Sequence, residues 1–380
     1  MSTATTAIEL LLLAIVVALI TKRFRLPYTI GLVACGLVVG FAKVLPLEVE
    51  RDLLLLVLLP PLLFEGALNM DLELLREQWF PVALYALAGT VVGTLVIGLL
   101  VWWPAQVLGI PISLPVSIFL GTILSATDPV SVLAMFKELG VEKRLAVILE
   151  GESVFNDGIA VVLYLVMYGA VKPGGQMPGL AEGLAQAVAV AGGGAAIGVA
   201  VGWVVFRILK HIDDHLLEVM ISVVLAWGAY LLAERVHASG VLAAVCAGLI
   251  IGNYGRLFSM SPTTRVTLGA FWEVAAFIAN SFLFILVGLQ MDRAAFARHL
   301  PIIGVTIVAM LASRAAVVHA LAPIARLAGW SLPRSWEHAL NVGGLRGSIP
   351  VALALGLPAA MPEREMLLAC VFGGVFFSLL

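Results

Sequence analysis

SLPVSIFLGTILSATDPVSVLAM, residues 113–135, has the length and apolarity of a membrane-spanning helix, yet its second half contains an aspartate followed by a proline. Pro129 lacks an amide hydrogen, and its ring leaves the carbonyl of Ser125 without a helical partner. The residue before a proline is pushed out of the α region, so we expect Asp128 to lie in an unwound segment. Unwound backbone at membrane depth lines cavities, and its carbonyls, here that of Thr127, can bind a cation. A simple proline kink, with Asp128 accepting from loose amides, is the alternative.

The composition of the whole chain is that of a membrane protein. Of the 380 residues, 62% are hydrophobic and 12% are charged, whereas soluble domains have about 25% charged residues. The net charge of −2 gives no basic surface for nucleic acid. Cys35, Cys246 and Cys370 lie far apart in apolar runs, so we expect neither a disulfide nor a metal site.

Apolar stretches of spanning length recur along the chain with short segments between them, which predicts one transmembrane domain over residues 1–380. We expect about thirteen spans, given that each needs roughly 20 apolar residues. They are residues 6–21, 27–42, 53–69, 79–103, 113–135, 146–170, 184–209, 216–234, 239–255, 267–290, 300–323, 336–356 and 365–380.

The ends of the chain and its loop charges predict an orientation. Lys22, Arg23 and Arg25 follow the first apolar stretch, so we interpret that stretch as a retained helix and not as a signal peptide. Basic residues are more frequent in the odd-numbered loops, which places the N-terminus outside and the C-terminus in the cytoplasm. The sequence stops inside an apolar run, so either the last helix ends there or a polar tail follows it.

A second interruption, NVGGLRGSIP at residues 341–350, occupies the corresponding place in the other half of the chain. Paired interruptions mark the substrate site of transporters built from inverted repeats. We therefore expect two six-helix repeats of opposite orientation, residues 6–170 and 216–380, joined by a helix at 184–209. In the second interruption Gly343, Gly344 and Gly347 weaken the helix around an arginine.

Polar side chains gather in ILEGESVFNDGIAVVLY, residues 148–164. Ser153, Asn156 and Asp157 have the spacing of one helix face. Their oxygens suit a hard monovalent cation, and a carboxylate that burial favours in its protonated form also binds a proton. Competition between cation and proton for Asp157 would be the basis of exchange. The alternative is that Asp157 caps a helix or forms a salt bridge.

Four more of the charged residues inside the predicted spans are functional candidates, because an ionised group there is costly. We expect Arg314 to pair with Glu152, because an unpaired buried charge is strongly destabilising. Arg346 would balance the carboxylates and the carbonyls at half-helix ends, unless it reaches the membrane surface. Glu65 follows two prolines and would line the access path or bind the ion, unless it reaches solvent at the cytoplasmic end.

Taken together and in this order, LLPPLLFEGAL, SATDPV, EGESVFNDG and NVGGLRGSIPVALAL resemble the NhaP-type sodium/proton antiporters of the first monovalent cation/proton antiporter family, which is related to the animal sodium/proton exchangers. The resemblance covers essentially the whole chain. It implies an all-α fold of thirteen helices, NhaA-like, in which two unwound helices cross, and a homodimer in the bacterial inner membrane. It also implies a transporter that serves pH homeostasis, not an enzyme, without a cofactor.

The resemblance also implies roles for individual residues. Asp157 would bind the ion and the proton with Asn156 as its partner, Na⁺ would be held by Asp157, Asp128, Ser153 and the Thr127 carbonyl, and Glu65 would join the site. Glu152 and Arg314 would form the core ion pair. The Asn156–Asp157 pair implies electroneutral exchange of Na⁺ or Li⁺ for H⁺. Potassium/proton antiport is an alternative, because ligand types do not separate ions by radius; a cation channel is another, although no ring-forming loop is seen.

Overall fold

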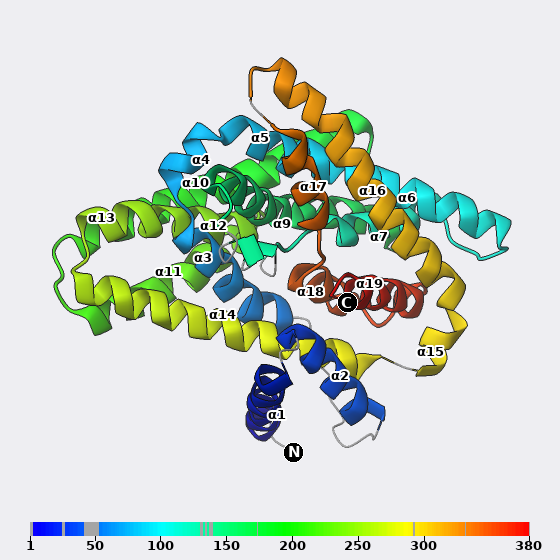
Figure 1. The fold of residues 1–380 in the computed structure, drawn as a ribbon, viewed down its shortest axis with the longest axis horizontal. Coiled ribbons are helices and arrows are strands. Elements are labelled where there is room, and N and C mark those ends of the chain that lie inside the picture. Colours follow the sequence, from blue (N-terminus) through cyan, green and yellow to red (C-terminus); the bar gives the residue numbers. More distant parts are fainter. Residues whose placement is uncertain are drawn as a thin grey trace.

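The structure is a computed structural model that describes residues 3–24, 27–41, 53–129, 132–133, 135–136, 140–172, 174–291, 293–330 and 332–379. Within these ranges every regular element is a helix and there is no β-strand (Figure 1). In chain order the elements, of which η1 to η3 are π-helical, are α1 (Thr3–Phe24), α2 (Tyr28–Phe41), η1 (Leu53–Leu58), α3 (Leu59–Asn69), α4 (Leu72–Glu77), α5 (Trp79–Ala83), η2 (Leu84–Gly89), α6 (Thr90–Val107), α7 (Leu114–Ser125), α9 (Lys143–Val171), α10 (Leu180–Leu209), α11 (His215–Arg235), α12 (Gly240–Ile250), η3 (Ile251–Gly255), α13 (Arg256–Phe258), α14 (Pro262–Gln290), α15 (Arg293–Arg298), α16 (Leu300–Leu327), α17 (Arg334–Val342), α18 (Ser348–Leu355) and α19 (Arg364–Leu379).

Several helical stretches have the length and apolarity of membrane spans. Seven qualify in the described part of the chain: Trp79–Val107, Lys143–Val171, Leu180–Leu209, His215–Arg235, Gly240–Phe258, Pro262–Gln290 and Leu300–Leu327. Three shorter apolar helices are Tyr28–Gly40, Leu56–Asn69 and Leu114–Ser125. An all-helical membrane protein is therefore confirmed. The count of thirteen spans and the inverted repeat stay predictions.

The helices pack in two groups that meet around the middle of the molecule. In one group α14 packs against α2, α3, α11 and α1, and α12 packs against α10, α11 and α3. In the other, α7 lies against α6 and α9, and α16 lies against α6 and α19. The groups touch where α14 meets α18 and where α3, α10 and α12 meet α9 (Figure 1).

Close packing of α7 on α6 fixes the first interrupted helix. A Cβ atom at Gly121 of α7 would overlap the carbonyl oxygen of Thr94 in α6, so only glycine permits this approach. The helix ends at Ser125, and residues 126–129 are not helical. Of the interruption predicted at 125–132, Val130 and Ser131 lie outside the described residues.

The span predicted at 336–356 consists of two helices, α17 and α18, separated by a non-helical segment at 343–347. Both halves are short, and Figure 1 shows α18 beside α19 and α17 beside α16. The polar interruptions of the two halves of the sequence are therefore places where helix gives way to unwound backbone. Such backbone has amides and carbonyls that need partners outside their own helix.

Candidate functional site

The two unwound segments contact each other through their backbones. The amide of Asp128 donates to the carbonyl oxygen of Leu345 at 2.8 Å. Gly347 lies so close to Asp128 that a Cβ atom at this position would overlap the aspartate side chain. The crossing of the two segments therefore requires glycine at 347 and brings the first carboxylate of the site to the middle of the bundle.

Side chains of α9 hold the unwound segment of the first half. The hydroxyl of Ser153 donates to the carbonyl of Thr127 at 2.7 Å, and the side-chain amide of Asn156 donates to the Thr127 hydroxyl at 2.6 Å. The Thr127 amide donates in turn to Asn156 Oδ1 at 3.4 Å. A carbonyl oxygen has two lone pairs, so that of Thr127 keeps one acceptor position when Ser153 is bound to it.

A cavity of about 130 Å³ brings most of the sequence-predicted site residues together. Its polar lining comes from α3, from the unwound segment after α7, from α9, from α14 and from the start of α18. The residues concerned are Glu65, Thr127, Asp128, Ser153, Asp157, Asn280 and Ser348. Three carboxylates and several neutral oxygens thus surround one small volume, a donor set that fits a hard cation and also binds protons.

Asn156 lies beside this cavity and not in its lining. Its contacts to Thr127 place it between the cavity and a second, smaller polar space that Glu152, Arg314 and Arg346 line. The role open to it in this geometry is to orient Thr127.

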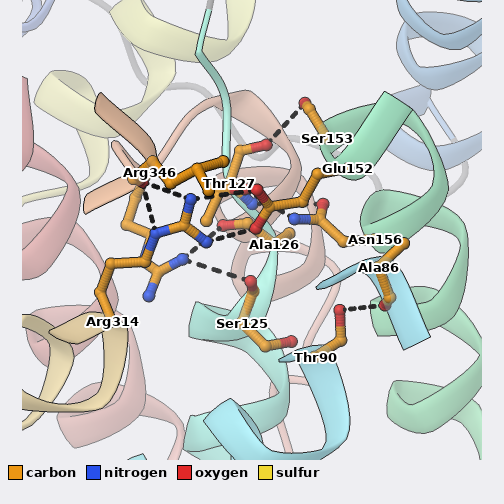
Figure 2. A network of polar contacts seen from close by, with 11 residues as sticks. Ala86, Thr90, Ser125, Ala126, Thr127, Glu152, Ser153, Asn156, Arg314 and Arg346 are labelled. Carbon is orange, nitrogen blue, oxygen red and sulfur yellow. Dashed lines mark hydrogen bonds and ion pairs between the residues drawn. The ribbon is translucent and has the colours of Figure 1, made fainter. Parts of the chain in front are cut away.

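Arg346 is buried, with 4% of its surface exposed, and does not reach the membrane surface. Its Nη1 donates to the carbonyl oxygens of Ser125 and Ala126 at 3.2 and 3.3 Å (Figure 2). These are carbonyls at the end of α7, where the helix dipole is negative. The guanidinium therefore compensates the interruption caused by Pro129, including the Ser125 carbonyl that the proline ring leaves without a partner.

Arg314 of α16 and Glu152 of α9 form a buried ion pair, with 9% and 3% of their side-chain surfaces exposed. Arg314 Nη1 contacts Glu152 Oε1, and Nη2 contacts Oε2 at 3.1 Å. Arg314 Nε also donates to the carbonyl of Leu340 at 2.9 Å, so the guanidinium joins α9, α16 and α17. Figure 2 shows this pair beside Arg346 and Thr127 but directed away from Ser153.

Asn280 of α14 is a residue of the cavity lining that the sequence reasoning missed. That reasoning considered charged residues within spans, whereas Asn280 is neutral and lies inside the apolar stretch 267–290. An uncharged amide at the centre of a span is the signal that would have found it, since polar side chains in membrane helices need partners.

The chain is similar to known proteins over nearly its whole length. The family profile described as "Sodium/hydrogen exchanger, transmembrane" matches residues 10–380. The Na⁺/H⁺ antiporter NhaP of Pseudomonas aeruginosa is 36% identical over 95% of this chain and 90% of its own length. The low-affinity Na⁺/H⁺ antiporter NhaS1 of Synechocystis sp. is 36% identical over 94% of this chain and 67% of its own.

The fold has a counterpart among solved structures. The sodium proton antiporter MjNhaP1 from Methanocaldococcus jannaschii superposes with a TM-score of 0.82 and 20% identity, covering 100% of this chain and 98% of that one. At this identity the likeness concerns the fold alone. From the match of its sequence along residues 10–380, the chain belongs to the sodium/hydrogen exchanger family.

Proposed function

We propose that the protein exchanges Na⁺ or Li⁺ for H⁺ across a bacterial inner membrane, and that cation and proton compete for Asp157. The observation that carries the proposal is the single cavity that Asp157 shares with Asp128, Ser153 and the Thr127 backbone. Relatives at 36% identity are named Na⁺/H⁺ antiporters, which supports sodium as the cation.

Competition follows from the chemistry of the lining. A cation held by Asp157 also engages neutral oxygens, whereas a proton needs only the carboxylate itself. Bound cation and bound proton therefore exclude each other at the same negative charge. The family resemblance implies, through the Asn156–Asp157 pair, that one carboxylate exchanges its proton, so we take one proton on Asp157 to be returned for each cation taken. Asp128 and Glu65, which line the same cavity, would keep their protonation state throughout. The proposed exchange is accordingly electroneutral.

Alternating access is proposed from the position of the cavity between the two helix groups. Glu65 and Asn280 belong to α3 and α14, whereas Asp128 and Asp157 belong to the group of α7 and α9. A displacement of one group along the other would expose the carboxylates first to one side and then to the other.

The remaining features of the proposal come from the sequence. Loop charge supports an outside N-terminus and a cytoplasmic C-terminus. The family resemblance supports a homodimer, and the paired interruptions support inverted repeats over residues 6–170 and 216–380 with a connecting helix at 184–209.

The test uses proteoliposomes with an imposed pH gradient, to which Na⁺, Li⁺ or K⁺ is added in parallel. We expect Na⁺ and Li⁺ to dissipate the gradient, Asp157→Ala to abolish the response, and the exposed loop variant Asp213→Ala to respond like wild type. Clamping the membrane potential with potassium and valinomycin should leave the initial Na⁺ rate unchanged. Exchange that persists in Asp157→Ala would refute the site, a response to K⁺ alone would refute the choice of cation, and a strong dependence on potential would refute electroneutrality.

A further inference from the structure

We propose that Asn280 is a further cation ligand, and that it contributes to the choice among monovalent cations from a different helix of the cavity wall than Asp157. This inference rests on the proposed function, because it adds a ligand to the same cavity. Asn280 lies in α14 and lines the cavity together with Ala276, one helical turn earlier on the same face.

The side-chain oxygen of Asn280 is buried and has no hydrogen-bond partner among the described residues. The neighbouring hydroxyl of Ser281 differs, since it donates to the carbonyl of Phe277 at 2.5 Å and contacts the Tyr28 hydroxyl at 2.8 Å. Buried polar atoms in proteins nearly always have partners, and one left without a partner at a cavity wall indicates a site for something that binds there.

The chemistry of this atom matches the rest of the lining. An amide oxygen accepts and carries a partial negative charge, and carbonyl-type oxygens of this kind replace the hydration shell of monovalent cations in selective sites. It adds no net charge, so it leaves one-for-one exchange unchanged. The amide does not itself take up a proton, so Asn280 adds a ligand for the cation without adding a second protonation site.

Asn280 and Asp157 belong to different helix groups of the fold. Asp157, Ser153 and Thr127 lie in the group of α7 and α9, whereas α14 packs on α2 and α3. A cation that contacts both Asp157 and Asn280 therefore joins the two helix groups. The ligand set is complete only when the groups stand as they do here, so the affinity for the cation depends on their relative position.

The test compares Asn280→Leu, which keeps the approximate size and removes the acceptor, with Ser281→Ala, a neighbouring change whose hydroxyl faces Tyr28. Exchange is measured in proteoliposomes over a range of Na⁺, Li⁺ and K⁺ concentrations at several pH values. We expect Asn280→Leu to raise the apparent KM for Na⁺ by roughly tenfold, the equivalent of one good polar contact. The maximal rate should stay within about twofold, and the ratio of the KM values for Na⁺ and K⁺ should change.

Two measurements, the KM for Na⁺ at several pH values and the unfolding temperature, distinguish a cation ligand from a residue with only a structural role. At each pH the KM for Na⁺ should rise by the same factor, because proton binding at Asp157 is untouched. In detergent without Na⁺, Asn280→Leu should unfold at the wild-type temperature or above it, since a buried acceptor without a partner has been removed. The rise in unfolding temperature that Na⁺ causes in wild type should become smaller. Ser281→Ala should keep the wild-type KM and the wild-type response to Na⁺.

Several outcomes would overturn the proposal. One is a wild-type KM for Na⁺ in both Asn280→Leu and Asn280→Ala, and another is a lower unfolding temperature without Na⁺ together with an unchanged response to Na⁺. Failure of both variants to fold would make Asn280 structural and overturn it as well. Absence of exchange in the wild-type protein would instead refute the proposed function, so the two failures are distinguishable.

Discussion

Two of the acidic residues of helix α9, Glu152 and Asp157, lie little more than one helical turn apart but have different surroundings. Glu152 is 3% exposed and meets Arg314 through both carboxylate oxygens. Asp157 lines a cavity that also holds Asp128, another acid. One carboxylate is neutralised by a fixed cationic side chain, and the other lies where a mobile cation or a proton would have to neutralise it.

The comparison teaches that burial alone does not distinguish the proposed exchange site on this helix from a structural ion pair. A carboxylate that is paired with an arginine through both oxygens has its charge compensated permanently. Separating the two would lose two charge-assisted hydrogen bonds, so the carboxylate does not readily bind another cation. A carboxylate at a cavity with neutral oxygens around it can exchange one small cation for another. Three experiments test this contrast, in order of decreasing effect.

The largest effect is expected for Asp157→Asn, which keeps the shape of the side chain and removes its charge. Exchange of Na⁺ for H⁺ in proteoliposomes should be abolished, because neither ion has a negative charge to bind. The unfolding temperature in detergent without Na⁺ should be unchanged or higher, since the repulsion with Asp128 disappears. A marked loss of stability, or retained exchange, would mean that Asp157 is a structural acid like Glu152.

The ion pair should respond in the opposite way. Glu152→Leu or Arg314→Leu leaves an uncompensated buried charge, so we expect each to lower the free energy of unfolding by about 3–5 kcal/mol. The combination Glu152→Leu with Arg314→Leu should lose much less than the sum of the single changes, because no charge remains unpaired. Unfolding of the four proteins in detergent by denaturant measures this, and additive losses would show that the two residues do not stabilise each other.

Sequence reasoning went furthest where the chemistry is local. Pro129 alone predicts an unwound Asp128 and a Ser125 carbonyl without a helical partner, and both are seen. The helical spacing of Ser153 and Asn156 predicts one face, and both side chains contact Thr127. These inferences need only the geometry of a few consecutive residues.

What could not be predicted depends on contacts between distant segments. The sequence predicts that Arg346 balances carbonyls at half-helix ends, but not that these are the carbonyls of Ser125 and Ala126, because those contacts follow from how the two unwound segments cross. Asn280 reaches the cavity from a helix whose sequence is otherwise apolar, and its role depends on the packing of α14. The carboxylates were identifiable from the sequence because an ionised group inside a membrane is costly in free energy and therefore indicates a function. A neutral amide costs less there, so its presence in a span indicates a function less clearly.

The smallest effect is expected for Ser153→Ala, which removes the hydroxyl that donates to the Thr127 carbonyl at 2.7 Å. The charge at Asp157 stays, so exchange should continue with an apparent KM for Na⁺ raised roughly three- to tenfold, the usual range for one neutral hydrogen bond. The control is Ser117→Ala, a buried serine of α7 whose hydroxyl donates to the carbonyl of Ser113, the N-cap residue of that helix, and which does not line the cavity. If Ser153→Ala abolished exchange as Asp157→Asn does, a neutral hydroxyl would matter as much as the charge, and the contrast between a compensated and an exchangeable carboxylate would no longer explain α9.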